Sequence, residues 1–563
     1  YYSYQKDGQW TAPEKYTTDN GSKFSFIFVG DPQIGSSNEL KGAATEEFYN
    51  AQSAAVANDA FNWNTTLNQA MEKTGNKASF VLSSGDQIQS TKKKSPNKAA
   101  WGSEIEYSGY LSPDVLKNLP VATTVGNHDA DNANYTYHFN TANASELGSN
   151  GKVGGDYWFK HDNALFIMLN TQDTNVEEHR QFIEQTVAAN KDCKWRIVTL
   201  HQDIYGSAEH SNEPEITNLR YTLVPYFEAN DVDVVLTGHD HAYSRTHILE
   251  GGHKTVEYTD DEFDAKLDKD MDAGENPATR YEAPANISAD SKETADVAYL
   301  NYLNAVMDKD AIEDTEKGET VVNPDGILYM TANSSSGSKY YDLVPRMQSY
   351  IANRWQEDVP TYSVIDVTDN TFTINTYRTD NDQKIDETFT IKKGVTEDIK
   401  SASVGNVKNQ IYTGKQIQPA IKVTLNGKTL KAGKDYTVTY TDNKNTGLAK
   451  ATINGIGKYT GTQTVTFKIV PKKAVLKTVK AGKSGTATVT IGKAGGKVSG
   501  YAIQVSTDSS FKKVTTYRTA KTTYTLKNLS KGKTYYVRVK AFTKVSDKNV
   551  YGAASKTIKV KAK

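Results

Sequence analysis

Six residues of types that commonly bind metal ions follow five short apolar runs of the sequence. They occur in the segments VGDPQIG, SSGDQIQ, TVGNHDA, TLHQDIY and GHDHAYSR, and they are Asp31, Asp86, Asn127, His201, His239 and His241. A carboxylate can bridge two metal ions, while neutral imidazoles and an amide oxygen complete the coordination without adding negative charge. Each residue taken alone is typical of an ordinary polar loop, but the ordered set of six predicts a two-metal site.

The two histidines of GHDHAYSR illustrate how the chain can bring such groups together. Residues 232–236 (VDVVL) form an almost continuous apolar run, which is typical of a strand buried in a parallel sheet. Alternate residues of an extended chain point the same way, so the side chains of His239 and His241 can reach one point. This fragment by itself fits a solvated polar turn equally well, because two spaced histidines are a weak motif.

The elements that would position these residues alternate between strands and helices. Between residues 24 and 393, strands are predicted at FSFIFVG, ASFVLSSG, LPVATTVG, ALFIMLN, WRIVTLH and VDVVLTG. Longer amphipathic stretches at 61–73, 177–190 and 215–230 predict helices. Such alternation indicates an α/β layered domain, in which ligands gather beyond the carboxyl ends of the strands.

The order D-x-Q, GD, GNHD, H and GHDH resembles the calcineurin-like metallophosphoesterase superfamily over about residues 24–393. The stretch from 200 to 245, which ends in GHDHAYSR, is similar to purple acid phosphatases. The resemblance implies an α/β fold, a layered β-sandwich flanked by helices. It also implies a metal-dependent phosphoric ester hydrolase with two divalent or trivalent ions (Fe, Mn or Zn), which hydrolyses phosphomonoesters by attack of a metal-bridging hydroxide.

Roles for the metal ligands follow from this resemblance. It places Asp31 and His241 on one ion, Asn127, His201 and His239 on the other, and Asp86 between the two.

Roles in catalysis follow in the same way for three further residues. His128 of GNHD is implied to contact the phosphoryl group or to protonate the leaving oxygen, and Asp129 is expected to orient His128. His210, nine residues after His201, falls where the family keeps a substrate-facing histidine. A position on a surface loop fits His210 equally well, because loop spacing drifts easily.

The sequence departs from the family at two ligand positions. Purple acid phosphatases have GD-x-x-Y, whose tyrosinate binds ferric iron, whereas this chain has Gln89 at that place. The wider superfamily often has D-x-H in the first motif, whereas this chain has Gln33, whose amide oxygen is a weaker ligand. We therefore expect no tyrosinate–iron colour, and looser binding at one of the two sites.

Length and composition predict several domains. The 563 residues include one cysteine, Cys193, so an intrachain disulfide is impossible, and no apolar run approaches the length of a membrane span. We predict a remnant of a preceding β-domain at 1–22 and the catalytic domain at 23–394. Two all-β sandwich domains are predicted to follow: an Ig-like module at 395–471 and a fibronectin type III-like domain at 472–563.

An acidic insertion at about 259–318 interrupts the catalytic domain, with a helix predicted near 295–307. Asp268, Asp270 and Asp272 imitate the opening of a calcium loop. Ala273 and Thr279, however, stand where such a loop needs glycine and glutamate. The sequence therefore favours a solvated insertion without calcium, which covers the site as a lid or solvates an edge.

Charge is distributed unevenly between the C-terminal part of the chain and the remainder. Residues 401–563 contain 32 Lys+Arg and 4 Asp+Glu, whereas the remainder contains 34 and 63. The basic part would suit an anionic cell-wall polymer, an anionic surface or its own acidic partner, although solubility alone also explains the excess. The Ig-like module resembles repeats of Gram-positive surface proteins, so we expect a secreted or cell-surface protein, with no nucleic acid as a structural partner.

Two other functions remain open at this stage. The ligand set does not separate a phosphomonoesterase from a phosphodiesterase that acts on nucleotides or cell-wall polymers. The basic C-terminal modules also suit a protein whose main role is surface binding or adhesion.

Overall fold

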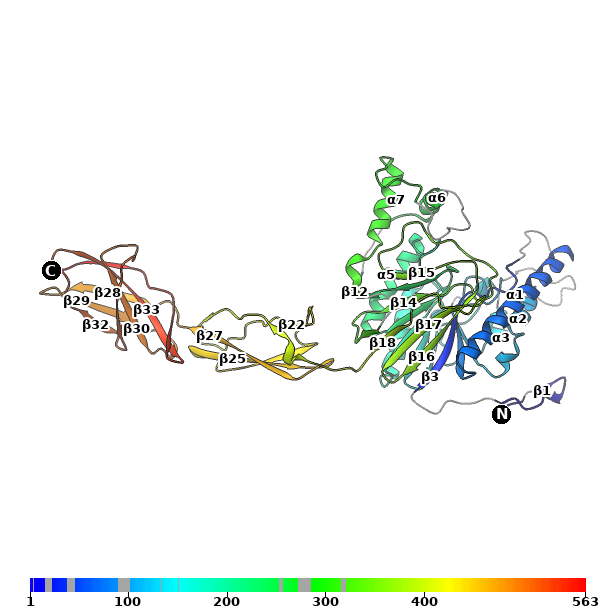
Figure 1. Ribbon diagram of the computed structural model, residues 1–563, viewed down its shortest axis with the longest axis horizontal. Helices are drawn as coiled ribbons and strands as arrows, with labels where there is room; N and C mark the ends of the chain where they lie inside the picture. Colours follow the sequence, from blue (N-terminus) through cyan, green and yellow to red (C-terminus); the bar gives the residue numbers. More distant parts are fainter. Residues whose placement is uncertain are drawn as a thin grey trace. The chain divides into compact units, whose positions relative to one another are not determined.

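The chain folds into two compact units, Tyr1–Lys393 and Gly394–Lys563, and each is described by itself. The computed structural model describes residues 1–3, 5–15, 23–37, 46–89, 102–131, 133–149, 151–252, 257–271, 285–314 and 320–563. Figure 1 shows the first unit as stacked sheets with helices outside, and the second as strands only.

Two seven-stranded sheets form the centre of the first unit. In spatial order, one sheet consists of β13 (Thr320–Val322), β18 (Phe389–Lys392), β17 (Thr371–Arg378), β16 (Thr361–Thr368), β3 (Lys23–Val29), β4 (Ala78–Ser83) and β5 (Val121–Thr123). The other consists of β15 (Ile351–Trp355), β10 (Tyr243–Thr246), β14 (Leu328–Thr331), β9 (Val234–Thr237), β8 (Trp195–Thr199), β7 (Ala164–Met168) and β6 (Tyr157–His161).

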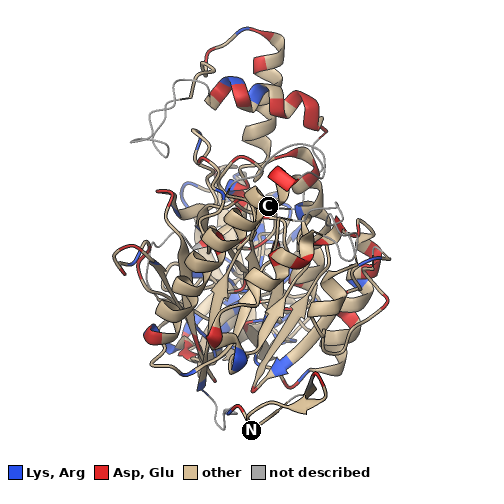
Figure 2. Ribbon diagram, turned by 90° about the vertical axis from the view of Figure 1, so that its right-hand side faces the viewer, with Lys and Arg blue, Asp and Glu red and all other residues tan. Residues whose placement is uncertain are grey.

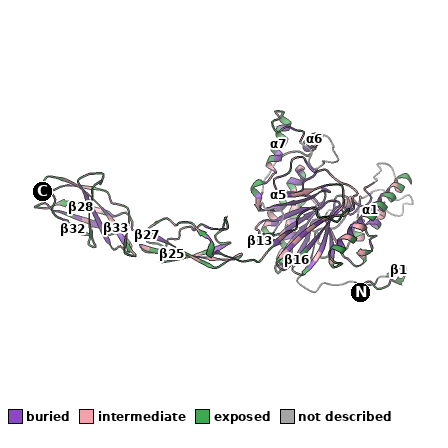
Figure 3. Ribbon diagram, in the orientation of Figure 1, coloured by how far each residue is buried: buried purple, intermediate pink, exposed green. Residues whose placement is uncertain are grey.

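The two sheets pack face to face through an aromatic core. The rings of Phe26 and Phe80 stack at 5.1 Å between centroids, and Phe166 meets both rings edge-on. This layer is buried throughout, as Figure 3 shows for the strands at the centre of the unit. The β-rich apolar runs of the sequence are therefore explained by burial between two sheets.

Helices cover the outer faces of both sheets. On one side Trp63 of α1 (Glu46–Lys73) packs in a cluster with Val81, and α2 (Ser103–Tyr110) lies beside α1. On the other side α4 (Val176–Ala189) and α5 (Pro214–Ala229) pack through Phe182 and Leu223. The predicted class, an α/β β-sandwich flanked by helices, is confirmed.

The parallel parts of the two sheets bring their strand ends to one side. Val29 of β3 is in register with Ser83 of β4, which in turn is in register with Thr123 of β5. In the other sheet Thr199 of β8 is in register with Leu236 of β9. The segments after these strands therefore emerge together, which places the predicted ligands near one another.

The acidic insertion has a hydrophobic core of its own, which its sequence did not indicate. Its helices α6 (Asp260–Met271) and α7 (Thr294–Ala305) pack through Phe263 and Tyr299, and their acidic residues are coloured red in Figure 2. Asp270 is buried on α6 and bonded to Arg346 at 2.7 Å, so the segment is more than a solvated loop.

Asp268 also lies on α6, in helix rather than in a calcium loop. The remaining positions of that imitation, Asp272, Ala273 and Thr279, fall outside the described residues.

Residues 5–10 form a small hairpin, in which β1 (Gln5–Lys6) pairs with β2 (Gln9–Trp10). Asp7 and Gly8 both have positive φ, as the tight turn of a two-residue hairpin requires. The origin of this segment as a remnant of a preceding domain stays a prediction.

The remaining short elements of the first unit are η1 (Asp114–Lys117), η2 (Asp129–Asp131), α3 (Tyr135–His138), β11 (Ile248–Leu249), η3 (Lys309–Ala311) and β12 (Ile312–Asp314). The predicted helices at 177–190, 215–230 and 295–307 match α4, α5 and α7 closely. The one predicted at 61–73 is only the second half of α1.

The second unit contains two successive β-sandwich cores. The first is built from β19 (Glu397–Asp398), η4 (Ile399–Ser401), β20 (Ser403–Val404), β21 (Gln410–Ile411), β22 (Val423–Leu425), β23 (Lys428–Thr429), β24 (Tyr436–Thr441), β25 (Gly447–Gly455), β26 (Tyr459–Thr460) and β27 (Thr462–Val470). The second is built from β28 (Val475–Ala481), β29 (Ala487–Gly492), β30 (Gly500–Ser506), β31 (Thr515–Thr519), β32 (Thr523–Leu526), β33 (Thr534–Val545), β34 (Lys548–Tyr551) and β35 (Ile558–Lys561).

Candidate metal centre

The predicted ligands emerge from the carboxyl ends of five strands in two different sheets. Asp31 follows β3, Asp86 follows β4, Asn127 and His128 follow β5, His201 follows β8, and His239 and His241 follow β9. A site at this edge therefore requires both sheets, and it forms only when they pack together.

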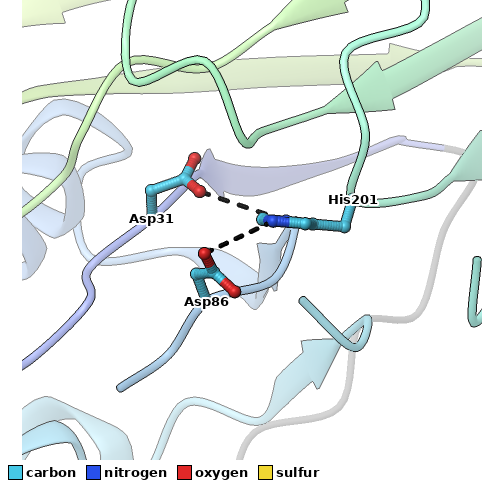
Figure 4. Close-up of side chains that lie close together, drawn as sticks. All are labelled: Asp31, Asp86 and His201. Carbon is cyan, nitrogen blue, oxygen red and sulfur yellow. Dashed lines mark ion pairs between the residues drawn. The ribbon is translucent and has the colours of Figure 1, made fainter. Parts of the chain in front are cut away.

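Asp31, Asp86 and His201 form the buried floor of the site. One ligand atom from each lies within 4.8 Å of the others, and all three side chains point toward one another in Figure 4. His201 Nε2 lies 3.4 Å from Asp86 Oδ2, and His201 Nδ1 lies 4.0 Å from Asp31 Oδ1. Two carboxylates and an imidazole at these separations suit a divalent cation.

Three ligand atoms converge on the Nε2 atom of His201. Asn127 Oδ1 lies 3.0 Å from it, His239 Nδ1 lies 3.2 Å from it, and Asp86 Oδ2 lies 3.4 Å from it. A second group lies beside Asp31, whose Oδ1 is 3.6 Å from His241 Nε2. The two groups contain the residues that the resemblance assigns to the two ions, and Asp86 lies in the first group; the assignment itself stays a prediction.

Backbone carbonyls fix which nitrogen of two imidazoles remains available. His201 Nδ1 lies 2.9 Å from Ser84 O, and His241 Nδ1 lies 3.0 Å from Lys339 O. A carbonyl only accepts a hydrogen bond, so each Nδ1 carries a proton, and Nε2 is the nitrogen that a metal ion can take. Nε2 of His201 lies toward Asp86, and Nε2 of His241 lies toward Asp31, as metal ligation requires.

The ligand-bearing turns hold non-glycine residues in left-handed backbone conformations. The φ angles are 45° at Asp31, 48° at Asp86, 74° at His239 and 45° at His241. Such conformations cost about 1–3 kcal/mol each and persist where the surrounding structure enforces them, often at functional sites. Their concentration on four of the six ligands indicates that the fold aims these side chains at a specific point.

The glycines that precede the ligands are required by close approach. A Cβ on Gly126 would lie 2.0 Å from Asp86 Oδ1, and one on Gly238 would lie 2.6 Å from Asp31 Oδ2. A Cβ on Gly85 would lie 2.4 Å from His201 Nδ1. Glycine therefore precedes Asn127, His239 and Asp86 because a neighbouring side chain packs directly against the backbone at each of these positions.

Burial sets the protonation of the ligands. It raises the pKa of the Asp31 carboxyl to about 8 and lowers the pKa of His241 to about 3. Burial and the charge of His201 hold the pKa of His239 well below its usual value. Burial also opposes ionisation of Asp86, but the electrostatic attraction of His201 outweighs it and depresses the pKa of that carboxyl. Neutral His239 and His241 are in the form that binds metal ions.

The two departures from the family pattern are bonded to each other. Gln33 Nε2 donates to Gln89 Oε1 at 2.7 Å, and Gln33 Oε1 is buried without a hydrogen-bond partner among the described residues. An unpaired buried acceptor is costly, so the amide oxygen of Gln33 suits a cation, as the sequence predicted. Its ligation stays a prediction.

His128 stands beside the floor, but Asp129 does not orient it. His128 Nδ1 lies 2.8 Å from the carbonyl of Gln89, and its Nε2 lies 4.0 Å from Asp86 Oδ2. The carboxylate of Asp129 instead accepts from the backbone N–H groups of Gly126 at 3.0 Å and Gln87 at 3.2 Å. Asp129 therefore braces the turns on both sides of Asp86, which corrects the expectation drawn from its position next to His128.

His210 lies beside the site rather than on a remote surface loop. Its ring is 4.8 Å from that of His239, and its Nδ1 lies 2.5 Å from Glu213 Oε1. The backbone N–H of His210 donates at 3.0 Å to Asp240, the residue between the ligands His239 and His241. His210 is half-buried and is therefore placed to meet a molecule entering the site.

Sequence analysis missed Lys339 and Tyr341, which lie on the loop after β14. The Tyr341 ring is 5.0 Å from that of His241 and 4.6 Å from that of His210. Lys339 Nζ contacts the Tyr341 hydroxyl and lies 4.4 Å from the centre of its ring. The signal was available, since the apolar run GILYMT before this loop is a strand like the other five.

The donors fit two divalent cations. Two carboxylates, three imidazoles and an amide converge at the site. They lie on turns with left-handed backbone conformations and closely approached glycines. Backbone carbonyls orient the imidazoles of His201 and His241 so that Nε2 of each lies toward the site. Asp86 stands next to both groups and is the residue suited to bridge them.

Residues 24–243 match the family described as calcineurin-like phosphoesterase, and residues 477–557 match the fibronectin type III domain. The chain is 28% identical over 195 residues to purple acid phosphatase 1 of Ipomoea batatas, which is 32% of this chain and 40% of that protein. An uncharacterized protein of Mycobacterium tuberculosis is 31% identical over 94 residues, 16% of this chain and 18% of its own length. The chain therefore spans less than half of the curated relatives it matches.

Among solved structures, purple acid phosphatase PPD1 of Lupinus luteus aligns with a TM-score of 0.42 at 13% identity, covering 67% of this chain and 55% of that one. A dimetal phosphatase from Danio rerio aligns with a TM-score of 0.30 at 10% identity, covering 66% of this chain and 98% of that one.

Proposed function

Because the chain carries a calcineurin-like metallophosphoesterase domain followed by a fibronectin type III domain, we propose that it is a phosphatase that hydrolyses phosphomonoesters with two metal ions. The observation that carries the proposal is the convergence of Asp86, Asn127, His201 and His239, with Asp31 and His241 beside them.

The ions, when bound, would activate water and neutralise phosphoryl oxygens. Asp31 and His241 would hold one of them, and Asn127, His201 and His239 the other, with Asp86 between. Buried Asp31 and Asp86 keep these positions shielded from solvent, which strengthens every electrostatic interaction inside the site.

Three half-buried groups of the chain face an incoming substrate. His128, with its Nδ1 held by Gln89, presents Nε2 on the side of Asp86 and is placed to give a proton to the leaving oxygen. His210, held by Glu213, is placed on the side of His239 to contact a phosphoryl oxygen. The Lys339 ammonium adds positive charge next to Tyr341.

Substitution of Asp86 by Asn tests this function. The exchange keeps the size of the side chain but removes the charge that would bridge the ions. We expect turnover of p-nitrophenyl phosphate to fall by at least about 100-fold, with the second ion lost from the purified protein. Intact activity in Asp86→Asn would refute the assignment.

A diester substrate is the alternative within the same chemistry. The ligands do not distinguish the two classes, but Lys339 beside the site favours the more highly charged monoester. Turnover of p-nitrophenyl phosphate against bis(p-nitrophenyl) phosphate, at equal metal loading, decides between them.

The second unit supports an added role in surface binding. Residues 401–563 contain 32 Lys+Arg and only 4 Asp+Glu, and this positive charge suits an anionic cell-wall polymer. The β-sandwich modules suit a secreted or surface-attached protein. Residues 394–563 form a compact unit and can be assayed alone. Binding to purified anionic wall polymer at low salt, lost at raised salt, is the expected result. Absence of binding at low salt would exclude this role.

Among the described residues, no helix has both the length and the apolar character that a membrane crossing needs.

A further inference from the structure

The loop that carries His210 is held in place by the acidic insertion. This His210 loop, residues 202–213, connects β8 to α5 and has no regular secondary structure of its own. Two of its residues directly after His210, Ser211 and Asn212, are buried although they belong to a loop. Their backbone carbonyls therefore need partners from neighbouring elements.

Tyr302 of the insertion binds one of these carbonyls. Its hydroxyl donates to Asn212 O at 2.8 Å and contacts Thr217 Oγ1 of α5 at 2.8 Å. All three residues are at most 4% exposed, so no water competes for these bonds. Tyr302 lies on α7, about ninety positions along the chain from the residue whose carbonyl it binds.

Arg220 of α5 binds the other carbonyl. Its guanidinium donates to Ser211 O at 2.9 Å and to the side chain of Asn212 at 3.0 Å. This buried cation is balanced by Asp308, whose Oδ2 lies 3.6 Å away and which belongs to the insertion. The insertion thus supplies both the hydroxyl that fixes Asn212 and the counter-ion of the arginine that fixes Ser211.

A third contact joins the two parts at the start of α5. Asp260, the first residue of α6, accepts from the backbone N–H of Glu215 at 3.0 Å. This bond lies just beyond Glu213, the carboxylate that holds the imidazole of His210. Residues of the insertion therefore contact the segment between His210 and α5 both at Asn212 and at Glu215.

We propose that the insertion is a positioning element of the active site, in which Tyr302 sets the place of His210 against the metal centre. The inference rests on the proposed phosphatase function, because it gives His210 the substrate-contacting role stated above. Tyr302 itself touches no ligand and acts through the backbone of Asn212. The insertion is then required for turnover, in addition to any part it has in shielding the entrance.

Substitution of Tyr302 by Phe tests the proposal, because it removes one hydroxyl and leaves the ring in its core. We expect kcat/KM to fall about tenfold, in the range that loss of a supporting hydrogen bond costs at a metal site, with metal content unchanged. Tyr299→Phe is the matched control, since Tyr299 is buried in the same α6–α7 core but, among the described residues, makes no hydrogen bond to the His210 loop. It should leave kcat/KM within twofold.

A double substitution separates positioning from general destabilisation. If Tyr302 acts through His210, Tyr302→Phe should cause no further loss in a His210→Ala background, whereas independent effects would multiply. Multiplying losses would overturn the proposal, as would unchanged kinetics of Tyr302→Phe alone. Asp260→Ala, at an exposed position, provides a milder second variant in which a loss of a few-fold is expected, and an unchanged rate there would also count against it.

A measurement of phosphate binding tests the positioning role of Tyr302 even if the protein hydrolyses no phosphoester. Calorimetric titration of the metal-loaded protein with inorganic phosphate measures the His210 contact without turnover. A protein that binds metal and phosphate but hydrolyses no phosphoester would refute the function, while weaker phosphate binding in Tyr302→Phe would still support the positioning role. Equal phosphate affinity of Tyr302→Phe and the unsubstituted protein would refute the positioning role.

Discussion

Replacement of Gly126 by alanine should disable the metal centre without removing any ligand. The added Cβ would lie 2.0 Å from Asp86 Oδ1 and 2.3 Å from the backbone nitrogen of Asp86. Ordinary contact begins near 3.4 Å, so the carboxylate must move by about 1.4 Å. Metal–ligand distances tolerate only about 0.2 Å of error, so Asp86 cannot keep its place between the ions.

The cost of this change divides between binding and folding. Overpacking of a closely packed interior costs about 1–3 kcal/mol, because the neighbouring backbone N–H of Asp86 has no flexible end that can move away. Misplacement of a reacting group by about 1 Å costs on the order of 100-fold in rate. We therefore expect a folded protein of reduced stability that binds at most one ion and has lost at least about 99% of its kcat/KM.

Elemental mass spectrometry after dialysis against trace divalent ions measures the ions per chain, and urea denaturation measures the free energy of unfolding. Gly405→Ala is the matched control, since its Cβ meets nothing nearer than 3.4 Å and its backbone has no positive φ. Two ions and undiminished turnover in Gly126→Ala would refute the inference that Asp86 occupies a fixed place in the centre.

Three further predictions follow from other parts of the site. Lys339→Met should raise KM for p-nitrophenyl phosphate about fivefold with kcat within twofold, because the ammonium beside the site attracts the negatively charged substrate. Substitution of the exposed Lys384 by Met is the kinetic control. An unchanged KM in Lys339→Met would exclude this role of Lys339. Gln89→Tyr, with iron supplied, should produce a visible tyrosinate absorption band that the unsubstituted protein lacks; a colourless iron-loaded variant would show that position 89 does not reach the metal. Chelation with EDTA should lower the unfolding temperature of the first unit, since ligation at about 1,000 times Kd adds about 4 kcal/mol to its stability. Calorimetry should show the transition of the second unit unchanged, and an EDTA-insensitive first unit would contradict metal binding.

The family pattern could be predicted from the sequence because its requirements are local. Ligand type is set by chemistry, and the glycines before Asp86, Asn127 and His239 are needed wherever a side chain packs against backbone. Strand patterns place these residues at carboxyl ends, and a short strand with a continuous apolar run indicates a buried parallel sheet. The order of the six ligands, the α/β class and the β-rich C-terminal region were thus accessible without coordinates.

Some elements escaped prediction because their local signals are weak. The first half of α1 is rich in Ala and polar residues and has little apolar periodicity, so the sequence pattern predicts only its second half. The insertion was described as solvated because its charges dominate its composition, although Phe263 and Tyr299 supply a core. Burial of a few aromatic residues in an acidic segment depends on a partner surface that the sequence does not name.

Partnerships within the site were decided by the tertiary structure alone. Asp129 neighbours His128 in sequence, yet its carboxylate binds the backbone of Gln87 and Gly126, whereas the carbonyl of Gln89 orients His128. A hydrogen bond depends on distance and direction in space, and the turn after β5 points adjacent side chains to opposite sides. The sequence by itself determined which groups can bind metal ions, and the packing of the two sheets decided which of them meet.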